Sequence, residues 1–325
     1  MKAVRVNDWG VEPRLEDVDD PVRASAHSTV RIQAATVGHI DRTIWSGGFI
    51  RPPTLPYTPG VEGSGIVLAS DSFPAGTRVW IRGGGLGVAV DGTWSEMISA
   101  PDTSLAVLPN DVDFTTGSAF FSPCASAWIA LHDIGVVRRD ERVVVTGASG
   151  AVGAVACQLA LEAGARVTGA VSSEASAALL TDGVTPLVFD RHNPTALKPF
   201  EADLLVDTVG GEMLATLLPM VVPGGKAVLI GYLAGTNLKI DLAAFIQRDV
   251  ALLPLNMLRR EAAGRRAAPE ILERIGSGRL RVDVETFALR DAGDAMRWLV
   301  GASHRGRAVL LPEQRPDDAT QRSRP

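Results

Sequence analysis

A glycine-rich corner near the middle of the chain has the residue types and the spacing of a phosphate-binding turn. Gly150 has no side chain to keep a pyrophosphate from the backbone N–H groups, and Gly153 lets the following helix pack closely on the preceding strand. The usual G-x-G-x-x-G pattern is altered at its first position, where this chain has Ala148. We interpret the corner as a dinucleotide-binding turn made by Ser149, Gly150, Ala151, Val152 and Gly153.

The elements around this corner are those that would position it. Val143 to Val145 predict a strand buried on both faces, and an apolar helix is expected from 154 to a stop at Gly164. A second strand at 166–171 follows at the spacing of a βαβ unit. More strands are expected at 186–190, 202–207 and 226–231, with a helix at 212–220. The pattern predicts an α/β fold with a Rossmann, doubly wound parallel sheet; the alternative is a glycine-rich loop in another kind of α/β protein.

The flanking residues predict a second domain that is rich in β-strands. Short strands punctuated by Pro and Gly are expected at 2–6, 29–35, 63–69, 78–81 and 96–100. Residues 114–134 have helical spacing that Pro123 should kink or divide, and the chain ends with a helix at 269–275, a strand at 281–284, a helix at 292–300 and a strand at 307–311. We therefore assign 1–113 and 258–313 to a catalytic domain, 114–257 to the dinucleotide domain, and 314–325 to a polar tail that we expect to be disordered.

Composition limits the classes of function. The 325 residues carry a net charge of −5, which provides no overall basic surface for nucleic acid or an anionic membrane. The two cysteines cannot form a disulfide scaffold, the N-terminus does not have the pattern of a signal peptide, and no apolar run approaches the length needed to span a membrane. We expect a cytoplasmic protein with a small-molecule substrate and with neither nucleic acid nor a membrane as partner.

Several short phrases lie in a characteristic order along nearly the whole chain. They are TPGVEGSGIV at 58–67, AGTRV at 75–79, GASGAVG at 147–153, VDTVGG at 206–211, PGGK at 223–226 and GRAVL at 306–310. Their order and spacing resemble the medium-chain dehydrogenase/reductase superfamily, and within it the zinc-independent quinone oxidoreductase branch. The resemblance implies a GroES-like catalytic domain interrupted by the Rossmann domain, an active site in the cleft between them, and a homodimer.

The resemblance also allows the metal positions to be checked. Zinc alcohol dehydrogenases of this superfamily hold a catalytic ion with a cysteine, a histidine and a second cysteine or histidine, and the matching positions here are Gly38, Val61 and Cys124. One thiolate cannot fix an ion that needs three protein ligands, so we expect no zinc. Without a Lewis acid, a conjugated acceptor that takes hydride at a carbon remote from its oxygen suits the site better than a simple alcohol.

The end of the second strand bears on the choice of cofactor. An acidic residue there would bind both ribose hydroxyls and repel a 2′-phosphate, which favours NADH. This chain has Ser172 and Ser173, whose small hydroxyls leave room for the phosphate, although Glu174 could still act as the acid. Arg191 could supply a positive charge if its loop lies near. We therefore expect NADPH rather than NADH as the cofactor.

The resemblance places four further residues near the nicotinamide half of the cofactor. Gly231 and Tyr232 are expected beside the nicotinamide or its ribose, and Leu255 and Asn256 near the carboxamide edge. The alternative for Leu255 is the protein core or a subunit interface.

Three side chains of the first domain are candidates for catalysis. The His39 imidazole could bind a cofactor phosphate or relay a proton to the enolate formed by hydride addition, or it could simply satisfy local backbone groups. Asp41 could orient His39, but capping a helix that begins at Arg42 is the better interpretation. Tyr57 could offer its hydroxyl to a substrate carbonyl, although packing is the commoner role of such residues. Trp45, Phe49 and Trp94 could supply apolar walls, although packing is again the commoner role, and the resemblance implies that Glu62 pairs with an arginine.

Taken together, these features favour an NADPH-dependent, zinc-independent reductase of quinones or of activated C=C bonds such as those of enones and enals. The first alternative is an NAD(P)H-dependent carbonyl reductase or alcohol dehydrogenase. The second alternative is a nucleotide-binding protein with little turnover.

Overall fold

The computed structural model describes residues 1–189, 200–301 and 305–313, which fold as two compact units. The parallel-sheet unit contains residues 120–189, 200–283, 305 and 306. The β-rich unit contains residues 1–119, 284–301 and 307–313. Each unit has a hydrophobic core of its own. The expected disordered tail lies outside the described residues.

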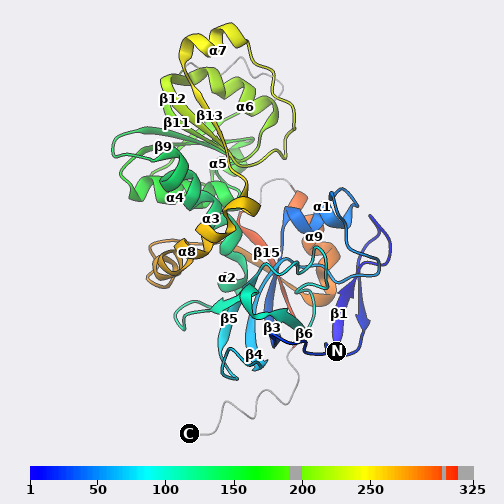
Figure 1. Cartoon of the computed structure of the whole chain (residues 1–325). Coiled ribbons are helices and arrows are strands. Elements are labelled where there is room, and N and C mark those ends of the chain that lie inside the picture. The colour runs from blue at the N-terminus through cyan, green and yellow to red at the C-terminus, as the bar shows by residue number, and fades with distance from the viewer. Residues whose placement is uncertain (190–199, 302–304, 314–325) are drawn as a thin grey trace. The chain divides into compact units, whose positions relative to one another are not determined.

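The parallel-sheet unit is built on six strands (Figure 1). They are β8 (Arg142–Thr146), β9 (Arg166–Val171), β10 (Thr185–Val188), β11 (Ala202–Asp207), β12 (Val221–Leu229) and β13 (Ala251–Pro254). Their order is β10-β9-β8-β11-β12-β13 and every pairing is parallel. Numbered along the chain this order is 3-2-1-4-5-6, which is the Rossmann arrangement, with its switch point beside the strand that precedes the glycine corner. The predicted fold class is confirmed.

Helices connect these strands and cover the sheet. They are α3 (Phe121–Trp128), α4 (Ala151–Glu162), α5 (Glu174–Ala177), α6 (Gly211–Leu217), α7 (Leu242–Arg248) and α8 (Met257–Gly276), with a π-helical turn at Ile129–Gly135 and a 3-10 turn at Leu218–Met220. The predicted division of 114–134 occurs at Phe120, between α2 (Phe114–Ala119) and α3. Pro123 lies in the first turn of α3, where its missing N–H costs no helical hydrogen bond.

Helix α8 is longer than the predicted helix at 269–275. It begins at Met257, and the Asn256 side chain caps it by accepting hydrogen bonds from the N–H groups of Leu258 at 3.0 Å and Arg259 at 3.3 Å. Pro269 lies inside the helix rather than at its start. The first half of α8 is rich in charged residues and lacks a continuous apolar stripe, so its periodicity was too weak to predict.

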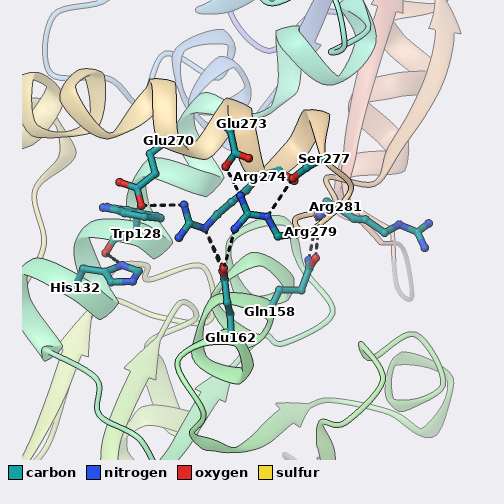
Figure 2. A network of polar contacts seen from close by, with 10 residues as sticks. All are labelled: Trp128, His132, Gln158, Glu162, Glu270, Glu273, Arg274, Ser277, Arg279 and Arg281. Carbon is teal, nitrogen blue, oxygen red and sulfur yellow. Dashed lines mark hydrogen bonds and ion pairs between the residues drawn. The ribbon is translucent and has the colours of Figure 1, made fainter.

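A network of charged and aromatic side chains fastens the last turn of α8 to its own unit, as Figure 2 shows. Arg274 donates to Glu162 at the end of α4, at 3.1 Å. Its guanidinium lies 5.0 Å from the centre of the Trp128 ring, which in turn stacks on the His132 imidazole at 4.1 Å. Because these partners come from α3, α4 and the π-helical turn, the network positions α8 against all three.

We expect Arg274→Ala to lower the free energy of unfolding by about 1–2 kcal/mol, because it removes ion pairs and a cation–π contact at partly buried positions. Arg274→Lys keeps the charge without the planar fork and should recover about half of the loss. Urea denaturation of the three proteins measures both effects. An unchanged midpoint for Arg274→Ala would show that the network contributes no net stability.

The β-rich unit contains a mainly antiparallel sheet with the path β14-β15-β3-β4-β5-β7, with β6 paired to β3, and a separate β1-β2 hairpin. Its strands are β1 (Lys2–Arg5), β2 (Arg14–Asp17), β3 (His27–Val37), β4 (Glu62–Ala69), β5 (Arg78–Arg82), β6 (Met97–Pro101), β7 (Leu105–Val107), β14 (Val284–Ala288) and β15 (Arg307–Leu311). Its helices are α1 (His39–Trp45), α2 and α9 (Ala292–Val300), with 3-10 turns at Asp102–Ser104 and Leu289–Asp291. The strand predicted at 281–284 begins instead at Val284, because β14 takes its register from β15.

The limits of the two units differ from the predicted domain limits of 113/114 and 257/258. Helix α2 packs on β3 and β4 of the β-rich unit, so that unit continues to residue 119. Helix α8 packs on α3, so the parallel-sheet unit continues to residue 283. Periodicity shows that a helix has an apolar face, but it does not show which sheet that face covers. Across the residues described, no helix is both long and apolar enough to span a bilayer.

Candidate functional site

The glycine corner has the geometry of a phosphate cradle. Gly150 is the N-cap of α4, and no side chain caps this helix end. The first-turn N–H groups of a helix have no carbonyl partner within it, and here the flanking residues Ser149, Ala151 and Val152 are only half-buried. A Cβ at Gly153 would lie 2.2 Å from the Gly147 carbonyl oxygen, so only glycine allows α4 to pack this closely on the turn. The structure therefore places Ser149 to Gly153 together at the N-terminal end of α4, which no side chain caps.

The end of β9 lies on the same unit and holds the residues assigned to cofactor choice. Ser172 is exposed, while Ser173 is the N-cap of α5 and its hydroxyl oxygen accepts from the Ser176 N–H at 3.1 Å. Of these two serines, only Ser172 has a hydroxyl that makes no hydrogen bond with another described residue. Glu174 is exposed in the first turn of α5. Arg191 lies outside the described residues, and its predicted role stays a prediction.

The residues predicted near the nicotinamide follow β12 and β13. Gly231 comes soon after β12, and a Cβ there would lie 2.0 Å from the Thr208 carbonyl oxygen. Tyr232 is 69% exposed, whereas Leu255 is buried. Asn256 is exposed and its side-chain oxygen caps α8, which leaves only its amide N–H groups for a ligand. The carboxyl ends of these strands are the edge of an open α/β sheet where ligands bind.

In the β-rich unit, Asp41 is fully buried and holds the start of α1. Its two carboxylate oxygens accept hydrogen bonds from the Gly38 N–H at 2.8 Å and the Val61 N–H at 3.1 Å. The helix begins at His39, three residues earlier than predicted, because Asp41 caps it from inside the first turn. Burial raises the pKa of Asp41 to about 6, against the opposing effects of the Gly38 hydrogen bond and the positive charge of Arg307.

This raised pKa predicts a pH dependence of stability. The folded protein binds a proton at Asp41 up to about pH 6, whereas the unfolded chain releases it near the ordinary aspartate pKa of 3.8. Stability should therefore fall as the pH rises through this window, by about 3 kcal/mol from Asp41 alone. Asp41→Asn does not titrate, so the difference in unfolding free energy between wild type and variant isolates this group. A difference that stays constant from pH 4 to pH 7 would contradict the assignment.

Tyr57 and His39 have different surroundings. The Tyr57 side chain is 2% exposed, and its hydroxyl has no hydrogen-bond partner among the described residues. Burial raises the pKa of this phenol, and the nearby charge of Asp41 adds to the effect. His39 is exposed at the start of α1, and both oxygens of Asp41 accept hydrogen bonds from backbone N–H groups. An unpartnered buried hydroxyl is the more unusual of the two features.

A buried ion pair lies next to Asp41. Arg307 Nη1 donates to Glu62 Oε2 at 2.5 Å and to the Ala119 carbonyl oxygen at 3.0 Å. Arg82 approaches the other oxygen of Glu62 at 3.7 Å. A Cβ at Gly38 would lie 2.9 Å from Arg307 Nη2, so the glycine leaves the space that the guanidinium occupies. The expected partner of Glu62 is thus Arg307, which the sequence did not single out.

The expected apolar walls are only partly as predicted. Trp45 and Phe49 pack against the buried cluster of Val6, Ile44, Tyr57 and Val61. Trp94 is instead fully buried in the main core of the unit, and its indole N–H donates to the Thr36 carbonyl oxygen at 2.9 Å. Trp94 is therefore a core residue rather than a wall. In the ranges 1–189, 200–301 and 305–313, no group of three or more His, Cys, Asp or Glu side chains could hold a metal ion.

Comparison with known proteins gives consistent results. Residues 25–110 match the family described as alcohol dehydrogenase GroES-like domain, and residues 183–310 match the family described as zinc-binding dehydrogenase. The chain is 30% identical over 247 residues to quinone oxidoreductase from Mus musculus, which covers 71% of this chain and 73% of that protein. It is 28% identical over 296 residues to acrylyl-CoA reductase AcuI from Ruegeria pomeroyi, covering 87% of this chain and 89% of that protein.

Comparison with solved structures leads to the same group of proteins. The structure of Escherichia coli quinone oxidoreductase complexed with NADPH superposes with a TM-score of 0.82 at 22% identity, over 96% of this chain and 100% of that chain. A GroES-like unit combined with a Rossmann sheet defines an oxidoreductase of the dehydrogenase class. The chain belongs to the medium-chain dehydrogenase/reductase superfamily and, within it, to the quinone oxidoreductase-like branch.

Proposed function

We propose that this protein is an NADPH-dependent, zinc-independent oxidoreductase that transfers hydride to a quinone or to an activated C=C bond of an enone or enal. The observation that carries the proposal is the uncapped glycine corner at the first strand-to-helix turn of a Rossmann sheet, in a chain of the quinone oxidoreductase-like branch. Acrylyl-CoA reductase, a relative over most of the chain, is named for an activated C=C substrate, which supports the second acceptor class.

The residues present fit a dinucleotide. The corner from Ser149 to Gly153 would hold the pyrophosphate, because Gly150 has no Cβ and the helix end lacks a side-chain cap. The exposed Ser172 hydroxyl would donate to a 2′-phosphate, and the NADPH complex of a structural neighbour supports this choice over NADH. Bound there, the reduced nicotinamide supplies hydride. Glu174 opposes NADPH by its charge, so Glu174→Gln should increase the preference for NADPH over NADH.

For the β-rich unit we assign Tyr57 as the donor to the acceptor oxygen. Hydride addition to a conjugated acceptor moves an electron pair onto its oxygen, and a neutral phenol can hydrogen-bond that oxygen or give it a proton. The raised pKa of Tyr57 keeps the proton on the hydroxyl at neutral pH. The exposed His39 imidazole would return the proton from solvent, and Asp41 would act only by holding α1 in place.

We propose that the protein works without zinc, because the three positions that hold the catalytic ion in zinc alcohol dehydrogenases do not provide three ligands here. Gly38 and Val61 have no ligand atoms in their side chains, and Cys124 is buried. The residues 183–310 that match the family described as zinc-binding dehydrogenase include none of these three positions. Activity should therefore survive chelation.

A single panel tests the function. Oxidation of NADPH and of NADH is followed against a quinone, an enone and a simple ketone, with and without chelator. Turnover of the quinone or enone with NADPH supports the proposal; turnover of the ketone alone favours a carbonyl reductase, and dinucleotide binding without turnover favours a binding protein. Chelator-sensitive activity would overturn the metal argument.

The same assay tests Tyr57. We expect Tyr57→Phe to lower kcat about tenfold or more while leaving the KM for NADPH unchanged, because only the hydroxyl proposed as the donor is lost. Ser99→Ala is the matched control, since Ser99 has another buried hydroxyl without a partner in the same unit and no proposed role. Equal activity of Tyr57→Phe and Ser99→Ala would reduce Tyr57 to a packing residue.

A further inference from the structure

A buried polar knot joins the ends of two central strands in the parallel-sheet unit. Thr146 is the last residue of β8 and Asp207 is the last residue of β11, and both are fully buried. The Thr146 hydroxyl donates to Asp207 Oδ1 at 2.6 Å and accepts from the Thr208 N–H at 2.9 Å. The Thr208 hydroxyl donates to the Thr146 carbonyl oxygen at 2.7 Å. Each strand end is thus tied to the other through side chains as well as through the sheet.

The knot extends to three loops at the carboxyl edge of the sheet. Gly147, the first residue after Thr146, has φ +60°, and a Cβ there would lie 2.6 Å from the Thr208 hydroxyl. The other oxygen of Asp207 accepts from the Gly210 N–H at 2.9 Å, and its carbonyl oxygen accepts from the Ile230 N–H at 2.8 Å. The loops after β8 and β11 therefore meet at one buried carboxylate and one buried hydroxyl, and the loop after β12 is bonded to the backbone of the same aspartate.

No cation among the described residues offsets the cost of burying the Asp207 carboxylate. No described lysine, arginine or histidine pairs with Asp207, and burial raises its pKa while the hydrogen bonds from Thr146 and Gly210 oppose this. A buried carboxyl group that is only hydrogen-bonded contributes little net stability compared with an apolar side chain. The carboxylate instead fixes geometry: because it accepts from two donors at set positions, the Thr146 hydroxyl and the Gly210 N–H, the loops that carry these donors can adopt few arrangements.

We propose that Thr146 and Asp207 are positioning residues for the dinucleotide, and that their buried hydrogen bonds hold the corner after β8 in register with the loops after β11 and β12. This inference rests on the proposed function, since it requires a dinucleotide that lies along this edge. The corner at Gly150 would bind the pyrophosphate and the loop at Gly231 the nicotinamide half, so the distance between them must match the length of the cofactor. We assign neither Thr146 nor Asp207 a contact with the ligand, because their polar groups are used in hydrogen bonds to each other and to the Thr208 and Gly210 N–H groups.

The test compares Thr146→Val, which removes the hydroxyl at nearly constant shape, with Thr146→Ser, which keeps it. We expect the Kd for NADPH to rise about tenfold in Thr146→Val and to change less than about threefold in Thr146→Ser. Adenosine 2′,5′-bisphosphate, which has neither the pyrophosphate bridge nor the nicotinamide, should bind the wild type and both variants equally. Thr36→Val is the control, because Thr36 is an equally buried threonine of the β-rich unit whose hydroxyl donates to the Ser118 carbonyl oxygen.

Binding is measured by fluorescence titration, and Tm is measured beside it. A lower Tm in Thr146→Val with an unchanged NADPH Kd, or a parallel loss of affinity for NADPH and the bisphosphate, would overturn the inference and leave the knot a structural feature. Loss of NADPH affinity in Thr36→Val to the same degree would also overturn it. Failure of the wild type to bind NADPH would overturn the proposed function itself, whereas full affinity in Thr146→Val overturns this inference alone.

Discussion

Gly153→Ala is expected to abolish dinucleotide binding and to lower the free energy of unfolding by at least about 3 kcal/mol. The added Cβ would lie 2.2 Å from the Gly147 carbonyl oxygen and 2.9 Å from the Ala148 Cα. Both neighbours are backbone atoms of the turn, so no side chain can move aside to make room. Helix α4 must shift away from β8, and the N–H groups of its first turn move with it.

Gly150→Ala separates the loss of dinucleotide binding from the loss of stability. Gly150 has φ −77°, which any residue adopts, and its added Cβ would lie 3.2 Å from the Gly147 carbonyl oxygen. We expect less than about 1 kcal/mol of destabilisation but about a tenfold or greater loss of NADPH affinity, because the new methyl group occupies the approach to the phosphate. Urea denaturation and a binding titration on both variants give the comparison. Equal stability of Gly153→Ala and Gly150→Ala would refute the packing role of Gly153.

Arg307→Met should destabilise the β-rich unit by about 3–5 kcal/mol, because it leaves the Glu62 carboxylate buried without its closest cation. The Glu62 side chain is 1% exposed and that of Arg307 8%, so water cannot replace the lost partner. Combining Arg307→Met with Glu62→Gln should cost less than the sum of the single changes, since the Glu62 charge is removed together with its closest cation. Arg290→Met is the control: its pair with Glu313 is exposed and worth at most about 1 kcal/mol.

The same variant has a pH signature. Arg307 lowers the pKa of Asp41, so its removal should raise that pKa above about 6 and move the loss of stability to higher pH. Near pH 5 Asp41 is protonated, so the missing cation matters less to it. The destabilisation by Arg307→Met, measured by denaturation, should therefore be larger at pH 8 than at pH 5. A destabilisation that is the same at both pH values would show that the buried charges are not its cause.

Local sequence patterns predicted correctly the bounds of helices and strands whose apolar pattern is complete within the segment itself. The strand 202–207, the helix 292–300 and the strand 307–311 have the predicted bounds, because each is a compact apolar or amphipathic run between breaking residues. The charged first half of α8 and the start of β14 were misplaced. Their positions depend on partners elsewhere, namely α3 and α4 for α8 and β15 for β14.

The candidate site shows the same division. The glycine corner was predictable because the turn, the helix start and the strand are contiguous, and the steric demands on Gly150 and Gly153 arise within a few residues. The partner of Glu62 could not be predicted from the sequence, since Arg307 is 245 residues away along the chain. The hydrogen bond between Thr146 and Asp207 spans 61 residues, and neither residue belongs to a binding motif.

The sequence by itself therefore determined the fold class, the family resemblance, the position of the glycine corner and the lack of ligand atoms in the side chains at Gly38 and Val61. Only the tertiary structure decided that Asp41 holds backbone N–H groups and that the buried Tyr57 hydroxyl has no partner among the described residues. It also decided that Arg307 and Asp207 are buried charged groups to which loops are hydrogen-bonded. The physical reason is that burial and charge pairing depend on segments brought together by the two sheets. Chain order alone does not specify those contacts.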